Sequence, residues 1–458
     1  MQWLVGLFDP ALPRRLRLLR AVLLGLLAAA CAFRVWLIFR FNPLDHMWSD
    51  PLRHWLLGIR PLDTSPMAAI DPVGYQIYLG VLAKITVHSP VLVAYWTALL
   101  SLSGPWLWYR FFRELLPSRD WALVGWVILA ALPSWSAIYS YFMQETLLLP
   151  LLGAALWATW RCRRKGDTAS FVFAAVLWLL TGLTRGICIP LAAVAITWLW
   201  ITQGGKLGKA ALAAALLLVT LGPLAGRSWA IARLISPHGV GQVVQIYYRS
   251  GAASIEFEFT RQRGREQWIY KFVSPSVNHA PLAPFSEWRS QREGAARFSI
   301  DLDAGRRDWQ AAMDSLPAWS IGRIARLGGE NVVQLFFGPS WPDSNLEKDR
   351  ERLIGKVNYW MRWIWAPLTI ACILATLVQW RRQRERLLPL LIVAWFVVQG
   401  LFPLSVNEGR YRKPFEGLLI AQLLLLAAGR RRTPFSRTPF TEPVRFPSDH
   451  AAGPSGTR

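Results

Sequence analysis

The sequence predicts an all-α polytopic membrane protein, built as a bundle of about ten transmembrane helices with a smaller extracytoplasmic domain. Hydrophobic residues make up 53% of the 458-residue chain. They gather in blocks whose length approaches the roughly 20 helical residues that cross a bilayer. Arg and Lys cluster between these blocks, and one orientation places every cluster on the cytoplasmic side. The clusters lie at residues 14–20, 110–119, 161–165, 206–209, 381–386 and 430–432.

The apolar blocks place the spans in order along the chain. The first block follows a basic start, but it is too long for a signal-peptide core, so we expect an uncleaved helix. Both termini are then cytoplasmic, and the protein is a multi-pass protein of the cytoplasmic (inner) membrane. We predict spans at residues 16–39, 90–109, 121–139, 145–160, 169–184, 187–202, 208–226, 357–380, 387–404 and 412–428.

Breaks in hydrophobicity divide the chain into four parts. About 130 mostly polar residues lie between the seventh and eighth spans, which is too long for a connector, so we expect an extracytoplasmic domain with helices near 304–317 and 319–337. The parts are an N-terminal transmembrane module (1–226) with an outer loop (41–72) and an interfacial helix (73–88), the extracytoplasmic domain (227–356), C-terminal transmembrane helices (357–428), and a basic, disordered cytoplasmic tail (429–458).

Charge and cysteine usage exclude several classes of function. The formal net charge is +23, from 51 basic and 28 acidic residues. Because this charge sits at helix ends, it orients the protein and meets anionic lipid, and we expect no nucleic-acid partner. The four cysteines are widely separated and read as small buried side chains. No Walker A, G-x-G-x-x-G, H-E-x-x-H or G-x-S-x-G sequence is present.

The outer loop concentrates ionisable side chains around Asp50. The segment Trp48-Ser49-Asp50-Pro51 holds a carboxylate between aromatic residues, where it could act as a general base on an acceptor hydroxyl or amine. Arg53 and His54 follow directly, and Asp45 precedes it. The competing interpretation is that Asp50 caps a helix starting at Pro51. A capping role is also expected for Asp71, which comes before Pro72 and Tyr75.

Further charged residues fall at the predicted outer ends of later spans. Glu145 starts the fourth span, where it either benefits from the helix dipole or lines a polar cavity. Arg185 lies at the tip of a short hairpin. Residues 410–413 (Arg410, Tyr411, Arg412 and Lys413) run against the positive-inside trend. Either the loop tolerates this charge, or these cations bind an outer-leaflet phosphate group, which arginine holds through two oxygens at once.

Taken together, these segments resemble the GT-C superfamily of membrane glycosyltransferases, and its protein O-mannosyltransferase and lipid A aminoarabinose transferase branches in particular. The resemblance covers the order of elements over most of the chain, apart from 227–356 and the tail. The matching segments are Trp48-Ser49-Asp50-Pro51, Asp71-Pro72-Val73-Gly74-Tyr75, Glu145-Thr146, Thr184-Arg185 and Arg410-Tyr411-Arg412-Lys413-Pro414.

The resemblance implies transfer of a sugar from a polyprenyl phosphate donor to a glycan, lipid or protein acceptor at the outer face. Asp50 would then be the base. Because Asp50 has no adjacent acidic partner, Asp45 or Asp71 would be the second carboxylate, and we assign Asp45 as the catalytic helper. This departure leaves a requirement for a divalent metal open, and no metal ligands are assigned.

The resemblance also implies roles for the cationic residues. Arg185, Arg410 and Arg412 would clamp the phosphate of the leaving group, and Glu145 would shape the sugar site. The remaining candidate substrate-binding residues are Arg53, His54, Asp71, Tyr75, Tyr411 and Lys413.

Two other functions fit a polytopic membrane protein. A transporter or flippase of a lipid-linked or envelope component usually carries internal repeats and charges near the bilayer midplane. The sequence contains no evident repeat, and its ionisable residues gather toward one surface. A non-catalytic scaffold of the same architecture is the remaining alternative.

Overall fold

The computed structural model describes residues 13–60, 68, 71–232, 240–252, 254–262, 264–273, 295–337, 352–378, 386–401 and 409–430. Within that part the protein is 81% helical, with sixteen α-helices and one three-stranded sheet. The mostly helical class is therefore confirmed, whereas the all-α prediction is wrong because a sheet lies in the domain after the seventh predicted span. The predicted tail beyond residue 430 lies outside the described residues.

Apolar blocks form the helices of the N-terminal module, close to the predicted ranges. The α-helices formed from these blocks are α2 (Arg14–Arg40), α6 (Pro90–Leu115), α7 (Arg119–Ala131), the short α8 (Pro133–Ala137), α9 (Gln144–Lys165), α10 (Thr168–Thr184), α11 (Ile189–Thr202) and α12 (Leu207–Ala232). The described part of the predicted outer loop contains η1 (Pro43–His46) and α3 (Ser49–Ile59), and the segment predicted as an interfacial helix forms α5 (Val73–Thr86). Short 3-10 turns η2 (Ile138–Ser140) and η3 (Gly186–Cys188) join neighbours.

The second half begins with the domain that contains the sheet. Its elements are α13 (Val240–Ser250), β1 (Ser254–Arg261), β2 (Glu266–Val273), β3 (Ala295–Asp301), α15 (Arg306–Asp314) and α16 (Ile321–Phe337). The last helices are α17 (Arg352–Val378), α18 (Leu387–Leu401) and α19 (Lys413–Arg430), with η7 (Gly409–Arg412) before α19.

Length and hydropathy together mark few spans among the described residues. Two helices, α2 and α6, are long and apolar enough to cross a membrane. A third crossing results if α7 and the segment 133–140, bent by 60° relative to each other, count as one span. The bend follows from Pro133, whose ring lacks the N–H that would continue the helix. The other apolar helices are shorter or interrupted, such as α10, α11 and α18.

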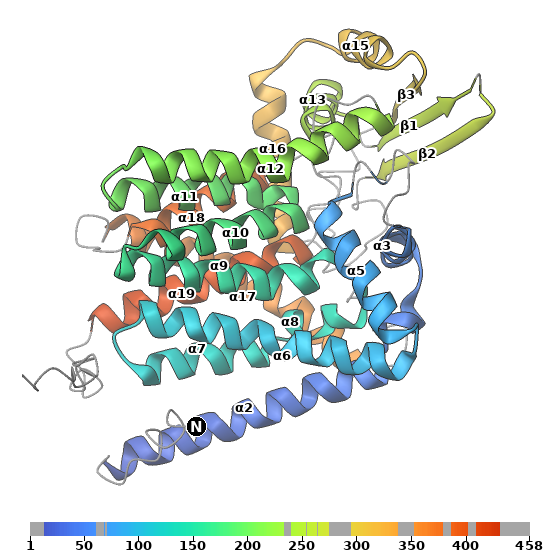
Figure 1. Ribbon diagram of the computed structural model, residues 1–458. Coiled ribbons are helices and arrows are strands. Elements are labelled where there is room, and N and C mark those ends of the chain that lie inside the picture. Colours follow the sequence, from blue (N-terminus) through green and yellow to red (C-terminus); the bar gives the residue numbers. More distant parts are fainter. Residues whose placement is uncertain are drawn as a thin grey trace, which may run out of the picture.

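Ion pairs bring the basic helix ends together at one end of the bundle. Arg20 of α2 binds Asp120 of α7 at 2.6 Å, and Arg164 of α9 pairs with Glu114 of α6. Lys209 of α12 donates to the carbonyl of Gly166 at 3.0 Å. The helices α3 and α5 and the sheet lie at the opposite end (Figure 1).

The bundle carries apolar side chains on its outside as well as in its core. Leu18, Val22 and Leu26 of α2 are 66%, 51% and 53% exposed, and α6, α12 and α17 also expose large apolar residues. Inside, the Trp108 ring of α6 lies so close to Gly153 of α9 that an added Cβ would approach the ring to 2.6 Å. An apolar exterior of this extent is typical of a surface that faces partners or lipid rather than water.

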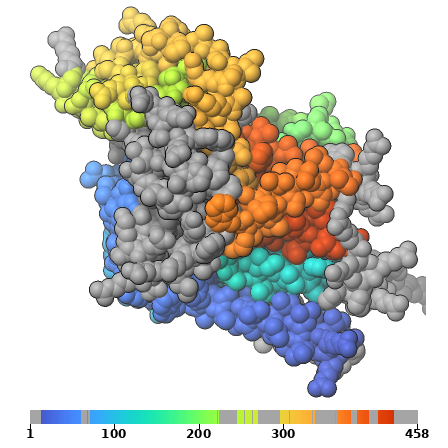
Figure 2. All heavy atoms as spheres, turned by 180° about the vertical axis from the view of Figure 1, so that it is seen from behind, coloured from blue at the N-terminus to red at the C-terminus, as the bar shows by residue number. Residues whose placement is uncertain are grey.

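The sheet forms the core of the domain between α12 and α17. Its strand order is β2-β1-β3, with β1 antiparallel to β2 and parallel to β3. Ile255, Phe257 and Phe259 alternate with exposed or half-exposed glutamates and pack against Trp309 of α15. Figure 2 shows these elements (yellow) as a lobe at one corner of the molecule.

Candidate active site

Arg53 joins two of the predicted acidic residues at the end of the bundle that carries α3 and α5. It lies one turn after Asp50 on α3, and its Nη1 donates to Asp50 Oδ1 at 2.6 Å. Its Nε donates to Asp71 Oδ2 at 2.7 Å, immediately before α5. The Asp50 side chain is 20% exposed and that of Asp71 is 9% exposed. Asp50 is therefore the more accessible of the two carboxylates.

The predicted capping roles of these carboxylates are wrong. Helix α3 begins at Ser49, with Trp48 at the N-cap position and Asp50 inside the first turn. Helix α5 has Pro72 at its N-cap, and no side chain caps it. Because both carboxylates are bound to Arg53 instead, their positions are set by packing between the two helices. Asp50 still lies where the helix dipole favours a negative charge.

A close approach of backbones fixes α3 against α5 and α5 against α10. An added Cβ on Gly58 would lie 2.5 Å from Leu79 Cβ, and one on Gly80 would lie 2.7 Å from the Gly58 carbonyl. An added Cβ on Gly74 would lie 2.8 Å from the Leu183 carbonyl carbon, at the C-terminal end of α10. Glycine is required at such contacts, and Gly74 brings the next residue, Tyr75, to the end of α10.

His54 and Tyr75 continue the polar contacts from Asp71 into the bundle. His54 Nδ1 lies 3.8 Å from Asp71 Oδ2, and its ring meets the Tyr75 ring edge-on at 5.6 Å. The Tyr75 hydroxyl lies 3.3 Å from Thr146 Oγ1. Burial, reinforced by the nearby Tyr78 and Glu145, raises the pKa of Tyr75 well above its ordinary value. The phenol is therefore neutral at physiological pH.

Glu145 and Arg185 form a buried ion pair next to Thr146. Glu145 is the second residue of α9 and is fully buried, and Arg185 follows the last residue of α10. The guanidinium of Arg185 also lies 4.0 Å from the centre of the Tyr411 ring, a cation–π contact. Glu145 lies in the first turn of α9, where a negative charge suits the helix dipole, and its pairing with Arg185 leaves open whether it also lines a polar cavity.

Arg412 and Lys413 are buried in the protein. The Arg412 side chain is 2% exposed, and its Nε donates to Glu416 Oε1 at 2.9 Å. Its Nη1 donates to the carbonyls of Leu335 and Phe336 at 3.0 and 2.8 Å. Arg412 thus satisfies the last carbonyls of α16 and ties that helix to α19. Lys413 is fully buried.

Arg412 has its described partners on α16 and α19, and no described contact places two other predicted site residues, Asp45 and Arg410, in this set. Asp45 is exposed on η1, and no described contact connects it to Asp50 or Asp71. Arg410 lies in η7, but its side chain is outside the described part of the structure. Sequence reasoning missed Glu416, which also accepts from Ser134 Oγ at 2.8 Å. Its spacing of four residues from Arg412 is the signal that could have revealed the pair.

The described residues do not suggest a bound metal. Within them, no three His, Cys, Asp or Glu side chains lie together as metal ligands would. The carboxylates of Asp50 and Asp71 both bind Arg53, so a guanidinium lies where a cation shared by these two carboxylates would have to bind. The donor set therefore does not fit a divalent ion.

Eight of the predicted site residues, together with Thr146, form one connected set, which we call the polar chain. It runs from Asp50 through Arg53, Asp71, His54, Tyr75, Thr146, Glu145 and Arg185 to Tyr411. It offers a carboxylate that is 20% exposed at one end and a buried guanidinium near the other. No protein family, curated protein or solved structure in our comparisons matches this chain.

Proposed function

We propose that the protein is a GT-C-type membrane glycosyltransferase. It transfers a sugar from a polyprenyl-phosphate-linked donor to a glycan, lipid or protein acceptor at the outer face of the cytoplasmic membrane. The observation that carries the proposal is the polar chain, which combines a candidate base with a candidate anion-binding arginine at the end of the bundle away from the basic clusters.

The proposal includes about ten membrane crossings with the polar chain on the extracytoplasmic side. The apolar exterior of α2, α6, α12 and α17 supports a lipid environment. Helices shorter than the bilayer can cross it when the surrounding protein satisfies the polar backbone groups at their ends. The clustering of Arg20, Arg164 and Lys209 at one end supports a cytoplasmic location for that end, by the positive-inside trend.

Asp50 is the proposed general base. Its carboxylate takes the proton of the acceptor hydroxyl or amine while the acceptor atom forms a bond to C1 of the sugar. The bond between C1 and the phosphate oxygen breaks, and its electron pair leaves with the polyprenyl phosphate. Arg53 orients the Asp50 carboxylate through its 2.6 Å bond, and Asp71 holds Arg53 in place.

Arg185 is the proposed binding group for the donor phosphate. The leaving phosphate gains negative charge as the C1–O bond breaks, and a guanidinium in a water-poor site stabilises that charge strongly. Glu145 holds Arg185 before the donor binds, and the cation–π contact with the Tyr411 ring fixes the orientation of the guanidinium. The contacts of Arg412 support a different role, in which it anchors α16 to α19.

The test is transfer by the purified protein in detergent from a polyprenyl phosphate sugar, with release of polyprenyl phosphate as the readout. Asp50→Asn is expected to lower the rate by about 100-fold or more, as loss of a general base does. Asp167→Asn is the control, because Asp167 caps α10 at the other end of the bundle and Asn caps equally well.

Equal rates for Asp50→Asn and wild type would reject Asp50 as the base. Movement of the intact lipid-linked sugar across vesicles, without release of polyprenyl phosphate, would instead support the flippase alternative and reject the transferase.

A further inference from the structure

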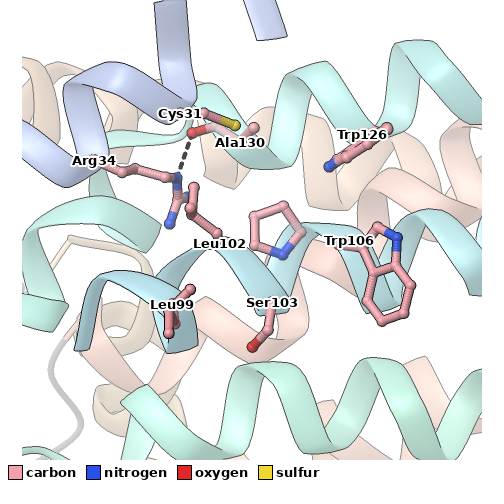
Figure 3. Close-up of a pocket in the computed structure, with 9 residues that line it drawn as sticks. Cys31, Arg34, Leu99, Leu102, Ser103, Trp106, Trp126 and Ala130 are labelled. Carbon is pink, nitrogen blue, oxygen red and sulfur yellow. Dashed lines mark hydrogen bonds between the residues drawn. The ribbon is translucent and has the colours of Figure 1, made fainter. Parts of the chain in front are cut away.

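A cavity of about 300 Å³ lies between α2, α6 and α7, and none of its lining residues belongs to the polar chain. Its apolar lining includes Cys31, Leu99, Leu102, Trp106 and Trp126. Figure 3 shows Trp106 and Trp126 at one end and Arg34 at the other. Leu99 and Trp106 are partly exposed, so the cavity opens toward the apolar outside of the bundle. Its volume is at the lower end of the range typical of ligand sites.

Arg34 is not available to a ligand in this cavity. Its guanidinium donates to the carbonyls of Leu129, Ala130, Ser101 and Trp135, at distances between 2.7 and 3.2 Å. The Arg34 end of the cavity is therefore internally satisfied, and any charged part of a ligand must lie at the other end.

The face of α6 that lines the cavity continues into arginines at the Trp106 end. Leu99, Ser103, Trp106, Arg110 and Arg113 recur at intervals of three and four residues, so they share one face of the helix. The Arg110 guanidinium lies 5.5 Å from the Trp106 ring. The rise from Leu99 to Arg110 is about 16 Å, which is about the hydrocarbon depth of one leaflet.

A second set of contacts places Arg113 at the same end. Its guanidinium lies 6.0 Å from the Tyr109 ring, and that ring stacks on Trp126 of α7 at 4.5 Å. On α7, Arg119 lies two helical turns before Trp126, so the two residues share one face of that helix, and Arg119 lies beyond the Trp126 end of the cavity. The cavity thus has an apolar body, and Arg110 and Arg113 lie just beyond its lining at the Trp106 and Trp126 end, where they form what we call the cationic rim.

The cationic rim has an excess of positive charge. Within the described residues, neither Arg110 nor Arg113 forms an ion pair with a carboxylate. The nearby carboxylates have other partners: Glu114 pairs with Arg164, and Asp120 binds Arg20 at 2.6 Å. Arg161 adds to the charge, since it and Arg110 both lie over the Trp157 ring, at 5.4 and 4.8 Å.

We propose that this cavity binds one anionic phospholipid, with an acyl chain along Leu99, Leu102 and Trp106 and the phosphodiester on Arg110 and Arg113. The apolar body selects a lipid over a free anion, and the cationic rim selects an anionic headgroup over a zwitterionic one. The site does not depend on glycosyl transfer, so it can be tested whether or not the transferase proposal holds.

The experiment measures retention of long-chain phosphatidylglycerol by the purified full-length protein, using native mass spectrometry. The double variant Arg110→Gln/Arg113→Gln is expected to weaken retention by about 30-fold, at about 1 kcal/mol for each cation lost near an anionic headgroup. The control, Arg163→Gln/Lys165→Gln, removes two charges from the same end of the bundle but outside the cavity face, and should retain the lipid.

A second variant tests the cavity itself. Ser103→Phe fills its apolar body and should reduce retention of long-chain phosphatidylglycerol while leaving a short-chain form unaffected. The proposal is overturned if phosphatidylcholine is retained as well as phosphatidylglycerol. It is also overturned if inorganic phosphate alone displaces the lipid, or if the Arg110 and Arg113 variant matches the control.

Discussion

Arg185 and Arg412 are both buried arginines paired with a glutamate, but Arg185 also contacts an aromatic ring whereas Arg412 also contacts backbone carbonyls. Arg185 lies over the Tyr411 ring at the end of the polar chain. Arg412 binds two carbonyls at the end of α16. Arg→Lys substitutions keep the positive charge while removing the flat fork of donors. The pair of substitutions therefore separates binding of the donor phosphate from anchoring of a helix.

We expect Arg185→Lys to raise the KM for the polyprenyl phosphate donor by about tenfold, at about 1.4 kcal/mol, with little change in acceptor KM. Arg412→Lys should leave donor KM unchanged and lower the free energy of unfolding by about 2 kcal/mol, because carbonyls of α16 lose their donor. Steady-state kinetics and thermal unfolding in detergent measure both quantities. A donor KM that rises only in Arg412→Lys would reverse the assignment.

Arg34 explains how α7 can end inside the bundle. Pro133 cannot donate to the Leu129 carbonyl, so the last carbonyls of α7 lack helical partners. Arg34 donates to Leu129 and Ala130 and also reaches Ser101 and Trp135. One side chain on α2 therefore joins three other segments.

Arg34→Lys should lower the free energy of unfolding by about 3 kcal/mol, since a single ammonium group leaves buried carbonyls unpaired. Arg17→Lys, on an exposed position of the same helix, is the matched control and should change nothing measurable. Chemical unfolding in detergent measures the difference. Equal stability of the two variants would show that Arg34 does not hold the α7 end.

The packing of α5 against α10 controls the polar chain, because it brings Tyr75 to Thr146. Gly74→Ala places a methyl group against the Leu183 carbonyl and forces the helices apart. We expect transfer to fall by about 100-fold, the usual effect of a displacement near 1 Å. Gly25→Ala is the control, since an added Cβ there meets no atom within 4 Å. Unchanged transfer by Gly74→Ala would mean that this contact does not position the site.

The ends of the helices could largely be predicted from hydrophobic blocks and their flanking charges, as α9, α10 and α19 illustrate. The sheet was missed although its signal is present: Ile255, Phe257 and Phe259 alternate with glutamates, which is the period of a half-buried strand. Pro133 also signalled the break in the third predicted span. The carbonyls that this break leaves unpaired bind Arg34, which is nearly a hundred residues away in sequence and could not be assigned from spacing.

The residues of the candidate site could be predicted individually but not their connections. Asp50 and Asp71 each precede or begin a helix in a pattern typical of capping, and only the contact between α3 and α5 assigns both to Arg53. That contact depends on Gly58 and Gly80, whose role cannot be read from spacing. Likewise, Arg412 and Arg185 both lie at the predicted outer end of a span, and only the structure shows that Arg412 is buried against α16.

The whole molecule has two chemically different ends joined by an apolar body. One end gathers the basic helix ends that hold Arg20, Arg164 and Lys209, and the other carries α3, α5 and the domain with the sheet (Figure 1). We propose that a bilayer covers the body between them. The two ends then meet different compartments, and a base that accepts a proton from an extracytoplasmic acceptor must lie at the end without the basic clusters.

Cysteine labelling in intact cells tests this arrangement most directly. Leu52→Cys introduces a thiol at an exposed position two residues from Asp50, and Lys165→Cys introduces one at the exposed end of α9. A membrane-impermeant maleimide added outside the cytoplasmic membrane should label position 52 and leave position 165 unlabelled until the cells are permeabilised. Labelling of both positions without permeabilisation, or of position 165 alone, would contradict the account.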